Sequence, residues 1–391
     1  MSVTSLRNPD PTAVPPPSRD ELAAWLRLAL THGVGPATAL TLLSAFGSAR
    51  AVIEASHGAV SRVAGAALAT RLVRPDPELD QSVAESLHWA ENPDNNLLTL
   101  ADPAYPRCLL DIPDPPPLLF VQGDISVLAQ PAFALVGSRQ ASLSGIENAG
   151  GFAAHLAGAG LCIVSGLAKG IDAAAHQGAI DAEGKTIAVL GTGIDRVYPV
   201  SNLALAGRIA ANGAIISEFP LGSGPLKSHF PRRNRLIAGL AAGVLVVEAA
   251  RRSGSLITAR LAGEFGRDVF AIPGSIHSPL ARGCHQLIRD GARLVETADD
   301  IISELRPDFL TAARATRPAT MNHAAAADLP NPTESSSSAL LEVIGWEPVS
   351  HDLLVQALGC PAGELDELLL DLELNGWLER LPDGRLQRLK N

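Results

Sequence analysis

Six short apolar runs, alternating with longer segments of helical spacing, constrain the fold of this chain more than any other feature of its sequence. The runs are FALVGS, CIVSGL, TIAVLGTG, AIISEF, VLVVEA and DVFAIPG, and they lie between Phe133 and Gly274. Their continuous apolar character is typical of strands buried on both faces, and helical patterns of about 10 to 18 residues separate them. The alternation predicts an α/β domain with a Rossmann-like, doubly wound parallel sheet.

The sequence before this core predicts a second domain, because 391 residues exceed the roughly 250 to 300 that one core usually organises. Residues 1–19 are rich in proline and are expected to be disordered. Residues 20–92 have helical spacing, as in ELAAWLRLAL and ATALTLLSAF, with the turn HGVGP between the two. We expect a helical domain there, SAM-like or helix-hairpin-helix-like, and the extended Rossmann-like domain over residues 93–305.

The sequence after the core predicts a linker and a small third domain. Residues 306–338 are rich in Ala, Pro, Ser and Thr and are expected to be a flexible linker. Within residues 339–391, one predicted helix ends at Gly376 and a hairpin follows in WLERLPDGRLQRL, which together indicate a winged helix. The apolar stripe of that helix is Leu365, Leu368, Leu369, Leu372 and Trp377.

Charge is distributed unevenly along a chain whose net charge is -10. Residues 131–305 hold 16 Lys/Arg against 14 Asp/Glu, whereas residues 339–391 hold 4 against 10. Only the Rossmann-like segment is net positive, so an anionic ligand is expected there and not at the C-terminal domain. The predicted helix GELDELLLDLELNG has acidic residues and no Lys or Arg, so we expect a protein-contacting or dimer-tuning role rather than contact with a DNA major groove.

Cysteine usage and hydropathy indicate a non-exported cytoplasmic protein. The four cysteines are far apart and form no CxxC or Cys/His cluster, so neither a zinc site nor a disulfide framework is expected. The N-terminus has no apolar segment of signal-peptide type, and no later segment offers the ~20 apolar residues of a membrane span.

Glycine-containing loops follow several of the predicted strands and lead into helices. They are VGSRQAS (136–142), SGLAKGID (165–172) and GTGIDRVYP (191–199), and KSHFPRRNR (227–235) precedes a further helix. In a parallel sheet these loops meet at the carboxyl edge, where backbone N–H groups and helix N-termini attract anions. Positive charge would be added at this edge by Arg139, Lys169, Lys227, Arg232, Arg233 and Arg235. The sequence therefore predicts a phosphate-binding edge.

Two known phosphate motifs do not fit. AIDAEGKT (179–186) lacks the first glycine of a P-loop, and its lysine precedes a predicted strand where it should open a helix. GTGIDR has Arg196 where a dinucleotide fingerprint has its third glycine. Neither an ATPase of the P-loop class nor an NAD enzyme is expected.

The basic residues also have structural interpretations. Arg232, Arg233 and Arg235 could form a solvated helix start, although cations at a helix N-terminus oppose the macrodipole and favour a bound anion. Arg139 could instead brace a carboxylate such as Glu218 or Glu248.

Other residues of these loops have alternatives as well. Lys169 could be an ordinary surface lysine, and Asp172 is expected to cap or orient its loop rather than to act in catalysis. Phe230 could stack a nucleobase or lie in the core.

Catalytic motifs are missing from the sequence. No GxSxG elbow, HExxH or paired-carboxylate spacing is present, and His176 and His285 have no evident catalytic partner. We expect a binding protein without enzymatic activity, metal or cofactor.

The motifs taken together resemble the DNA-processing protein A family, also called DprA/Smf. They are YPRCLLDIPDPPPLLFVQG, VGSR, SGLAKGIDAAAH, TIAVLGTGIDRVYP, ISEFPLG, HFPRRNRLIAGL, EAARRSGSLITA and VFAIPGSIHSPLARGCHQLIRDGA, from about Tyr105 to Ile302. The resemblance implies a homodimer, built through the Rossmann domain, that binds and protects single-stranded DNA in natural transformation and loads a RecA-type recombinase. His285 stands where many members of the family carry Asn.

Resemblance and loop positions together give the expected single-stranded DNA site: Gly137, Ser138, Arg139, Ser165, Gly166, Lys169, Gly170, Gly191, Gly193, Phe230, Arg232, Arg233, Asn234 and Arg235. If about five phosphates are neutralised, log affinity should fall with log salt at a slope of about -3.5. The alternative is a nucleotide-processing enzyme like the phosphoribohydrolases, whose PGGxGTxxE signature is replaced here by EAARRSGSLITA. A purely structural adaptor is a third possibility.

Overall fold

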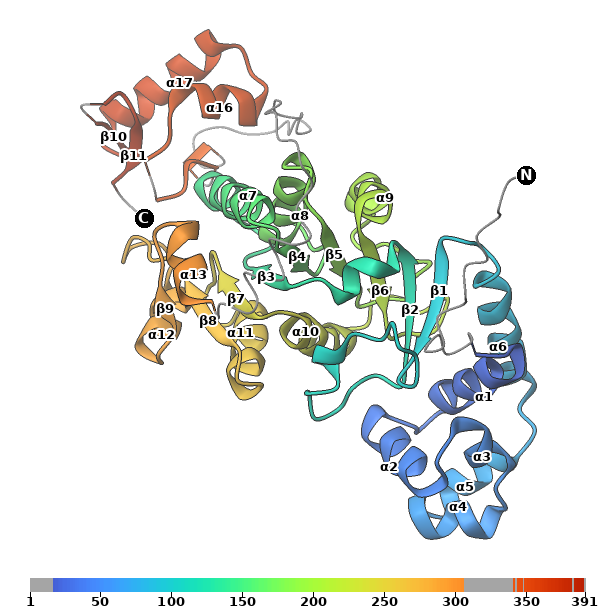
Figure 1. Ribbon diagram of the computed structural model, residues 1–391. Helices are drawn as coiled ribbons and strands as arrows, with labels where there is room; N and C mark the ends of the chain where they lie inside the picture. Colours follow the sequence, from blue (N-terminus) through green and yellow to red (C-terminus); the bar gives the residue numbers. More distant parts are fainter. Residues whose placement is uncertain (1–16, 306–339, 342, 347, 382, 390–391) are drawn as a thin grey trace, which may run out of the picture. The chain divides into compact units, whose positions relative to one another are not determined.

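The computed structural model describes residues 17–305, 340–341, 343–346, 348–381 and 383–389 (Figure 1). Contacts divide the chain into two compact units, Met1–Tyr105 with Pro113–Phe120 and Pro106–Ile112 with Val121–Asn391. The segment 306–338 expected to be a linker lies outside the described residues, as does nearly all of the expected disordered N-terminus.

The first unit is mainly helical, which confirms the expected N-terminal helical domain. Its helices are α1 (Arg19–Leu30), α2 (Pro36–Phe46), α3 (Ala49–Glu54), α4 (His57–Ala64), α5 (Ala66–Val73) and α6 (Pro77–Trp89). Ser18, Ser48, Ser56 and Asp76 each accept a hydrogen bond from a backbone N–H in the first turn of the following helix. Strand β1 (Asn95–Thr99) lies beside β2 (Leu118–Gly123), whose first half belongs to this unit.

The second unit contains the parallel sheet that the six apolar runs predict. Its strands are β3 (Ala132–Val136), β4 (Cys162–Ser165), β5 (Thr186–Val189), β6 (Ala214–Ser217), β7 (Gly243–Val246), β8 (Asp268–Ala271) and β9 (Arg293–Leu294). They lie in the order β6-β5-β4-β3-β7-β8-β9, and each neighbouring pair is parallel. Strands β4 to β6 are added in order on one side of β3, and β7 to β9 in order on its other side. The order of the strands therefore reverses between β3 and β7, and ligands of doubly wound sheets bind outside the carboxyl ends at such a switch point.

Helices cover both faces of this sheet. They are α7 (Leu143–Gly158), α8 (Ile171–Asp181), α9 (Leu203–Asn212), α10 (His229–Leu240), α11 (Ser255–Glu264), α12 (Arg282–Arg289) and α13 (Ala298–Glu304). Figure 1 shows α7 and α8 on one face and α10 and α11 on the other. Short 3₁₀ helices occur at Arg107–Leu109 (η1), Ile125–Ala129 (η2) and Val200–Asn202 (η3).

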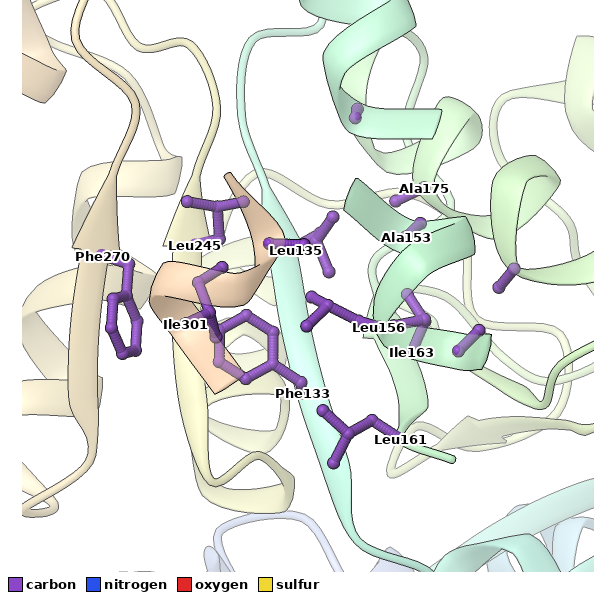
Figure 2. Close-up of a cluster of buried hydrophobic side chains, with 14 of the residues drawn as sticks. Phe133, Leu135, Ala153, Leu156, Leu161, Ile163, Ala175, Leu245, Phe270 and Ile301 are labelled. Carbon is purple, nitrogen blue, oxygen red and sulfur yellow. The ribbon is translucent and has the colours of Figure 1, made fainter. Parts of the chain in front are cut away.

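A buried apolar cluster joins strands and helices on the α7 side (Figure 2). Phe133 of β3 and Phe270 of β8 are fully buried, with ring centroids 5.8 Å apart. Leu156 of α7 and Ala175 of α8 close over the strands in the same cluster. This rigid core fixes the strand ends, and therefore the loops that follow them.

The C-terminal residues form the predicted winged helix. Helices α16 (His351–Leu358) and α17 (Ala362–Leu374) precede the antiparallel hairpin of β10 (Leu378–Arg380) and β11 (Leu386–Arg388). Leu365, Leu369 and Leu372 are buried as predicted. The predicted stripe is wrong at two positions, because Leu368 is 39% exposed and Trp377 follows the end of α17.

No helix in the described part of the chain has the length and hydropathy required to cross a membrane.

Candidate nucleic-acid interface

The loops that follow β3, β4 and β5 contact one another at the carboxyl edge of the sheet. The N–H of Ile171 donates to the carbonyl of Ser138 at 3.2 Å, which joins the β3 and β4 loops. The side-chain amide of Asn202 donates to the carbonyls of Leu167 and Ala168 at 3.0 and 3.2 Å. Three separate stretches of sequence are therefore held as one surface.

Two glycines of this surface are required by close approach of the chain. Gly170 has φ +71°, and a Cβ there would lie 2.4 Å from the carbonyl oxygen of Ser138. A Cβ at Gly166 would lie within the guanidinium of Arg233. These residues allow the β3 and β4 loops to pack against each other and against α10.

The remaining candidates in the loops lie at the same edge. Ser165 is buried and its hydroxyl donates to the carbonyl of Leu135 at 2.6 Å, so it is a structural contact. The hydroxyl of Ser138 accepts the N–H of Gln140, and Gly137 packs on Ile171. Gly191 and Gly193, in the loop after β5, are both buried.

Arg139 and Phe230 form the exposed centre of this edge. Arg139 is exposed, and its guanidinium carbon lies 5.0 Å from the centroid of the half-buried Phe230 ring. Tyr198, which is also exposed, places its ring 6.0 Å from that of Phe230. Phe230 is thus not a core residue, and an aromatic pair with a cation above it faces solvent. Lys169 and Lys227 are exposed in the neighbouring loops.

The three arginines of HFPRRNR have different environments. The side chain of Arg232 is 49% exposed, and its guanidinium lies 3.1 Å from Glu218 and 5.2 Å from the centroid of Phe219. The side chain of Arg235 is only 6% exposed and pairs with the same carboxylate at 2.5 Å. The carboxylate of Glu218 is buried. Arg235 neutralises this internal charge, whereas Arg232 contacts the same carboxylate from the solvent side.

Arg233 is buried beneath the β4 and β5 loops. Its Nη1 donates to the carbonyl of Val189 at 2.9 Å. Burial lowers the pKa of Arg233 to about 10, against the opposing effect of the Asp172 carboxylate, so the guanidinium remains charged at neutral pH. Burial raises the pKa of Asp172, and the charge of Arg233 opposes that shift.

Asp172 orients its own loop, as predicted. Its carboxylate accepts the N–H groups of Gly166 and Ala168 at 3.2 and 3.4 Å. Asn234 is similarly internal, with its side-chain amide donating to the carbonyl of Gly254 at 3.2 Å. The predicted site therefore separates into an exposed set and a buried set that supports it.

Glu218 and Glu248 are engaged by groups other than Arg139. The carboxylate of Glu248 accepts the N–H and hydroxyl of Ser142, the N-cap residue of α7, at 3.0 and 2.5 Å. Among the described residues Arg139 has no ion pair, so the interpretation of Arg139 as a brace for these carboxylates finds no support.

His176 and His285, for which the sequence offered no catalytic partner, are structural. Burial lowers the pKa of His176 to about 3, so its ring is neutral, and its Nδ1 lies 2.7 Å from the hydroxyl of Thr186. That hydroxyl donates to the carbonyl of Ile163, so the histidine N–H donates to Thr186. The Nε2 of His285 lies 3.0 Å from the carbonyl of Gly274.

Lys185 of the rejected P-loop motif directly precedes β5, as expected. In the described ranges, no group of three or more His, Cys, Asp or Glu side chains could hold a metal ion. The sequence did not assign Tyr198 and Asn202 to the site. Tyr198 lies within the loop GTGIDRVYP and Asn202 follows that loop. The aromatic residue in this glycine-containing loop was the available signal.

Fold and site together define a class of protein: a Rossmann-like domain with a cationic, aromatic carboxyl edge, accompanied by a helical domain and a winged helix. The sequence profile described as DNA recombination-mediator protein A matches residues 96–306. Profiles for the DprA-like N-terminal HHH domain and the DprA winged helix domain match residues 19–69 and 324–384. The chain belongs to the DNA recombination-mediator protein A family, DprA/Smf, as the resemblance predicted.

Individual relatives agree with this assignment. Protein Smf of Escherichia coli is 42% identical over 79% of this chain and 82% of its own length. Protein Smf of Synechocystis is 34% identical over 95% of this chain and 100% of its own length. The X-ray structure of DNA processing protein A from Streptococcus pneumoniae is similar with a TM-score of 0.64 and 40% identity, over 72% of this chain and 96% of that one.

Proposed function

We propose that the chain binds single-stranded DNA at the carboxyl edge of its Rossmann-like domain. The observation that carries the proposal is the exposed guanidinium of Arg139 above Phe230, with Tyr198 beside the same ring. Cations can bind phosphates while aromatic faces stack bases without sequence preference. A duplex keeps its bases stacked inside. Its phosphates could therefore bind the cations, but its bases could not stack on the rings. Membership in a family of DNA recombination mediators supports the same conclusion.

The buried arginines reduce the number of phosphates expected at this edge. Among the six cations predicted at this edge, Arg139, Lys169, Lys227 and Arg232 are exposed, whereas Arg233 and Arg235 are buried. With about four phosphates neutralised, the salt slope for a single strand becomes about -2.8 instead of about -3.5.

This slope is directly measurable. We expect fluorescence anisotropy with a labelled poly(dT) oligonucleotide to give a slope of log affinity against log salt of about -2.8. A duplex of equal length should bind more weakly at every salt concentration, because Phe230 and Tyr198 cannot stack on its bases. A slope near zero, or equal affinity for the duplex, would contradict the proposed site.

The family also guides the biological part of the proposal. We propose that the protein acts in the cytoplasm as a homodimer, protects incoming strands in natural transformation, and delivers them to a RecA-type recombinase without enzymatic activity of its own. The alternative is a phosphoribohydrolase-like enzyme. Incubation with nucleoside monophosphates separates the two, since release of free base would favour the enzyme.

A further inference from the structure

Helix α17 of the winged helix has an exposed apolar face as well as the buried one. Its inner side chains Leu365, Leu369 and Leu372 pack in the domain core with Leu354 of α16. On the outer side, Leu370 is 56% exposed and Leu374 is 79% exposed. These two leucines are one helical turn apart and therefore neighbours on the surface.

Acidic side chains surround these leucines. Glu367 and Asp371 each lie three residues before one of the two leucines, which places them on the same strip of the helix. Asp366 and Glu373 are paired with His351 and Arg380. Within the described residues, Glu364, Glu367 and Asp371 form no ion pair, so these acids remain available to an external cation.

The basic residues of the described part of this domain are engaged internally. Arg380 pairs with Glu373 at 2.9 Å and Arg385 with Asp383 at 2.7 Å. Arg388 donates to the carbonyl of Leu341 and lies over the ring of Trp346. The surface of α17 is therefore anionic, and it would repel the phosphates that the corresponding helix of many winged helices contacts.

We propose that the outer face of α17 docks a basic amphipathic segment of another protein. Charge complementarity selects the partner: apolar side chains would cover Leu370 and Leu374, and flanking Lys or Arg would pair with Glu367 and Asp371. This surface belongs to a different domain from the proposed DNA site, and the inference does not depend on that site.

The test uses the full-length chain and a fluorescent helical peptide built only of Leu and Lys at amphipathic spacing. We expect Leu370→Ser/Leu374→Ser to weaken peptide binding at least tenfold, and Glu367→Lys/Asp371→Lys to do the same. The control is Leu203→Ser, which changes a leucine that is 59% exposed on α9 and should leave binding unchanged. Because all changed side chains are exposed, thermal unfolding should be unaffected.

Three results would overturn this inference. One is equal peptide affinity of the wild type and both α17 variants, since the peptide would then bind elsewhere. Another is a change in sedimentation of the Leu370→Ser/Leu374→Ser chain alone, which would make a second copy of this chain the occupant. A third is tighter duplex binding by wild type than by Leu370→Ser/Leu374→Ser, which would make the face a DNA contact.

Discussion

Gly170→Ala is expected to destabilise the protein by about 3 kcal/mol and to abolish most single-strand binding. Alanine at φ +71° costs roughly 1 to 3 kcal/mol in backbone strain alone. Its Cβ would also lie 2.4 Å from the carbonyl oxygen of Ser138, and this backbone atom cannot rotate away as a side chain could. Relief requires the β3 and β4 loops to separate, which displaces Arg139 and Lys169.

The matched control is Gly151→Ala in α7. Gly151 is exposed, and a Cβ there would meet no atom within 4 Å. Alanine in a helix interior is favoured over glycine by about 1 kcal/mol, so this variant should be more stable than wild type. Urea unfolding measures both changes. Similar stabilities of the two variants would show that the two loops do not pack as described.

Arg235→Ala is expected to cost about 3 to 5 kcal/mol, because it leaves the buried carboxylate of Glu218 without its buried partner. Arg232→Ala removes a cation from the same carboxylate but from a side chain that is 49% exposed. A pair of that exposure contributes at most about 1 kcal/mol. The two substitutions remove the same chemical group, so burial is the variable that separates them.

The two variants should also differ in DNA binding. Arg232→Ala should fold normally and bind single strands more weakly, whereas Arg235→Ala should unfold at lower urea concentration. Equal unfolding midpoints would contradict the assignment of Arg235 as the internal partner and Arg232 as the exposed cation. Circular dichroism at 222 nm during urea titration is sufficient for the comparison.

Sequence patterns predicted the sheet well, because strands buried on both faces have continuous apolar runs. The strands β3 to β8 each coincide with one such run. Strands β1, β2 and β9 were not predicted: β1 begins with two asparagines, and β9 has only two residues, both exposed. The strand state of β1 and β9 depends on pairing with neighbours more than on their own composition, whereas β2, LLFVQG, has the apolar run of a buried strand.

The site was predictable to the level of its loops but not to that of its side chains. Glycines after strands indicated where the backbone approaches closely, as at Gly166 and Gly170. Arg232, Arg233 and Arg235 look equivalent in sequence. Their different environments depend on Glu218, which follows β6, and on Val189 at the end of β5. Local sequence cannot specify which guanidinium a distant carboxylate will bury.

Single-strand affinity of two double variants tests the central claim most directly. Arg139→Ala/Arg232→Ala removes two exposed cations from the carboxyl edge. Arg208→Ala/Arg260→Ala removes two from α9 and α11, where they pair with Asp181 and Glu264. Both variants change the net charge equally. We predict an affinity loss of about 100-fold for the first, from two charge-assisted contacts of about 1.5 kcal/mol each, and less than about threefold for the second. Equal losses would mean that binding reflects overall charge, and no loss in the first variant would place the DNA elsewhere.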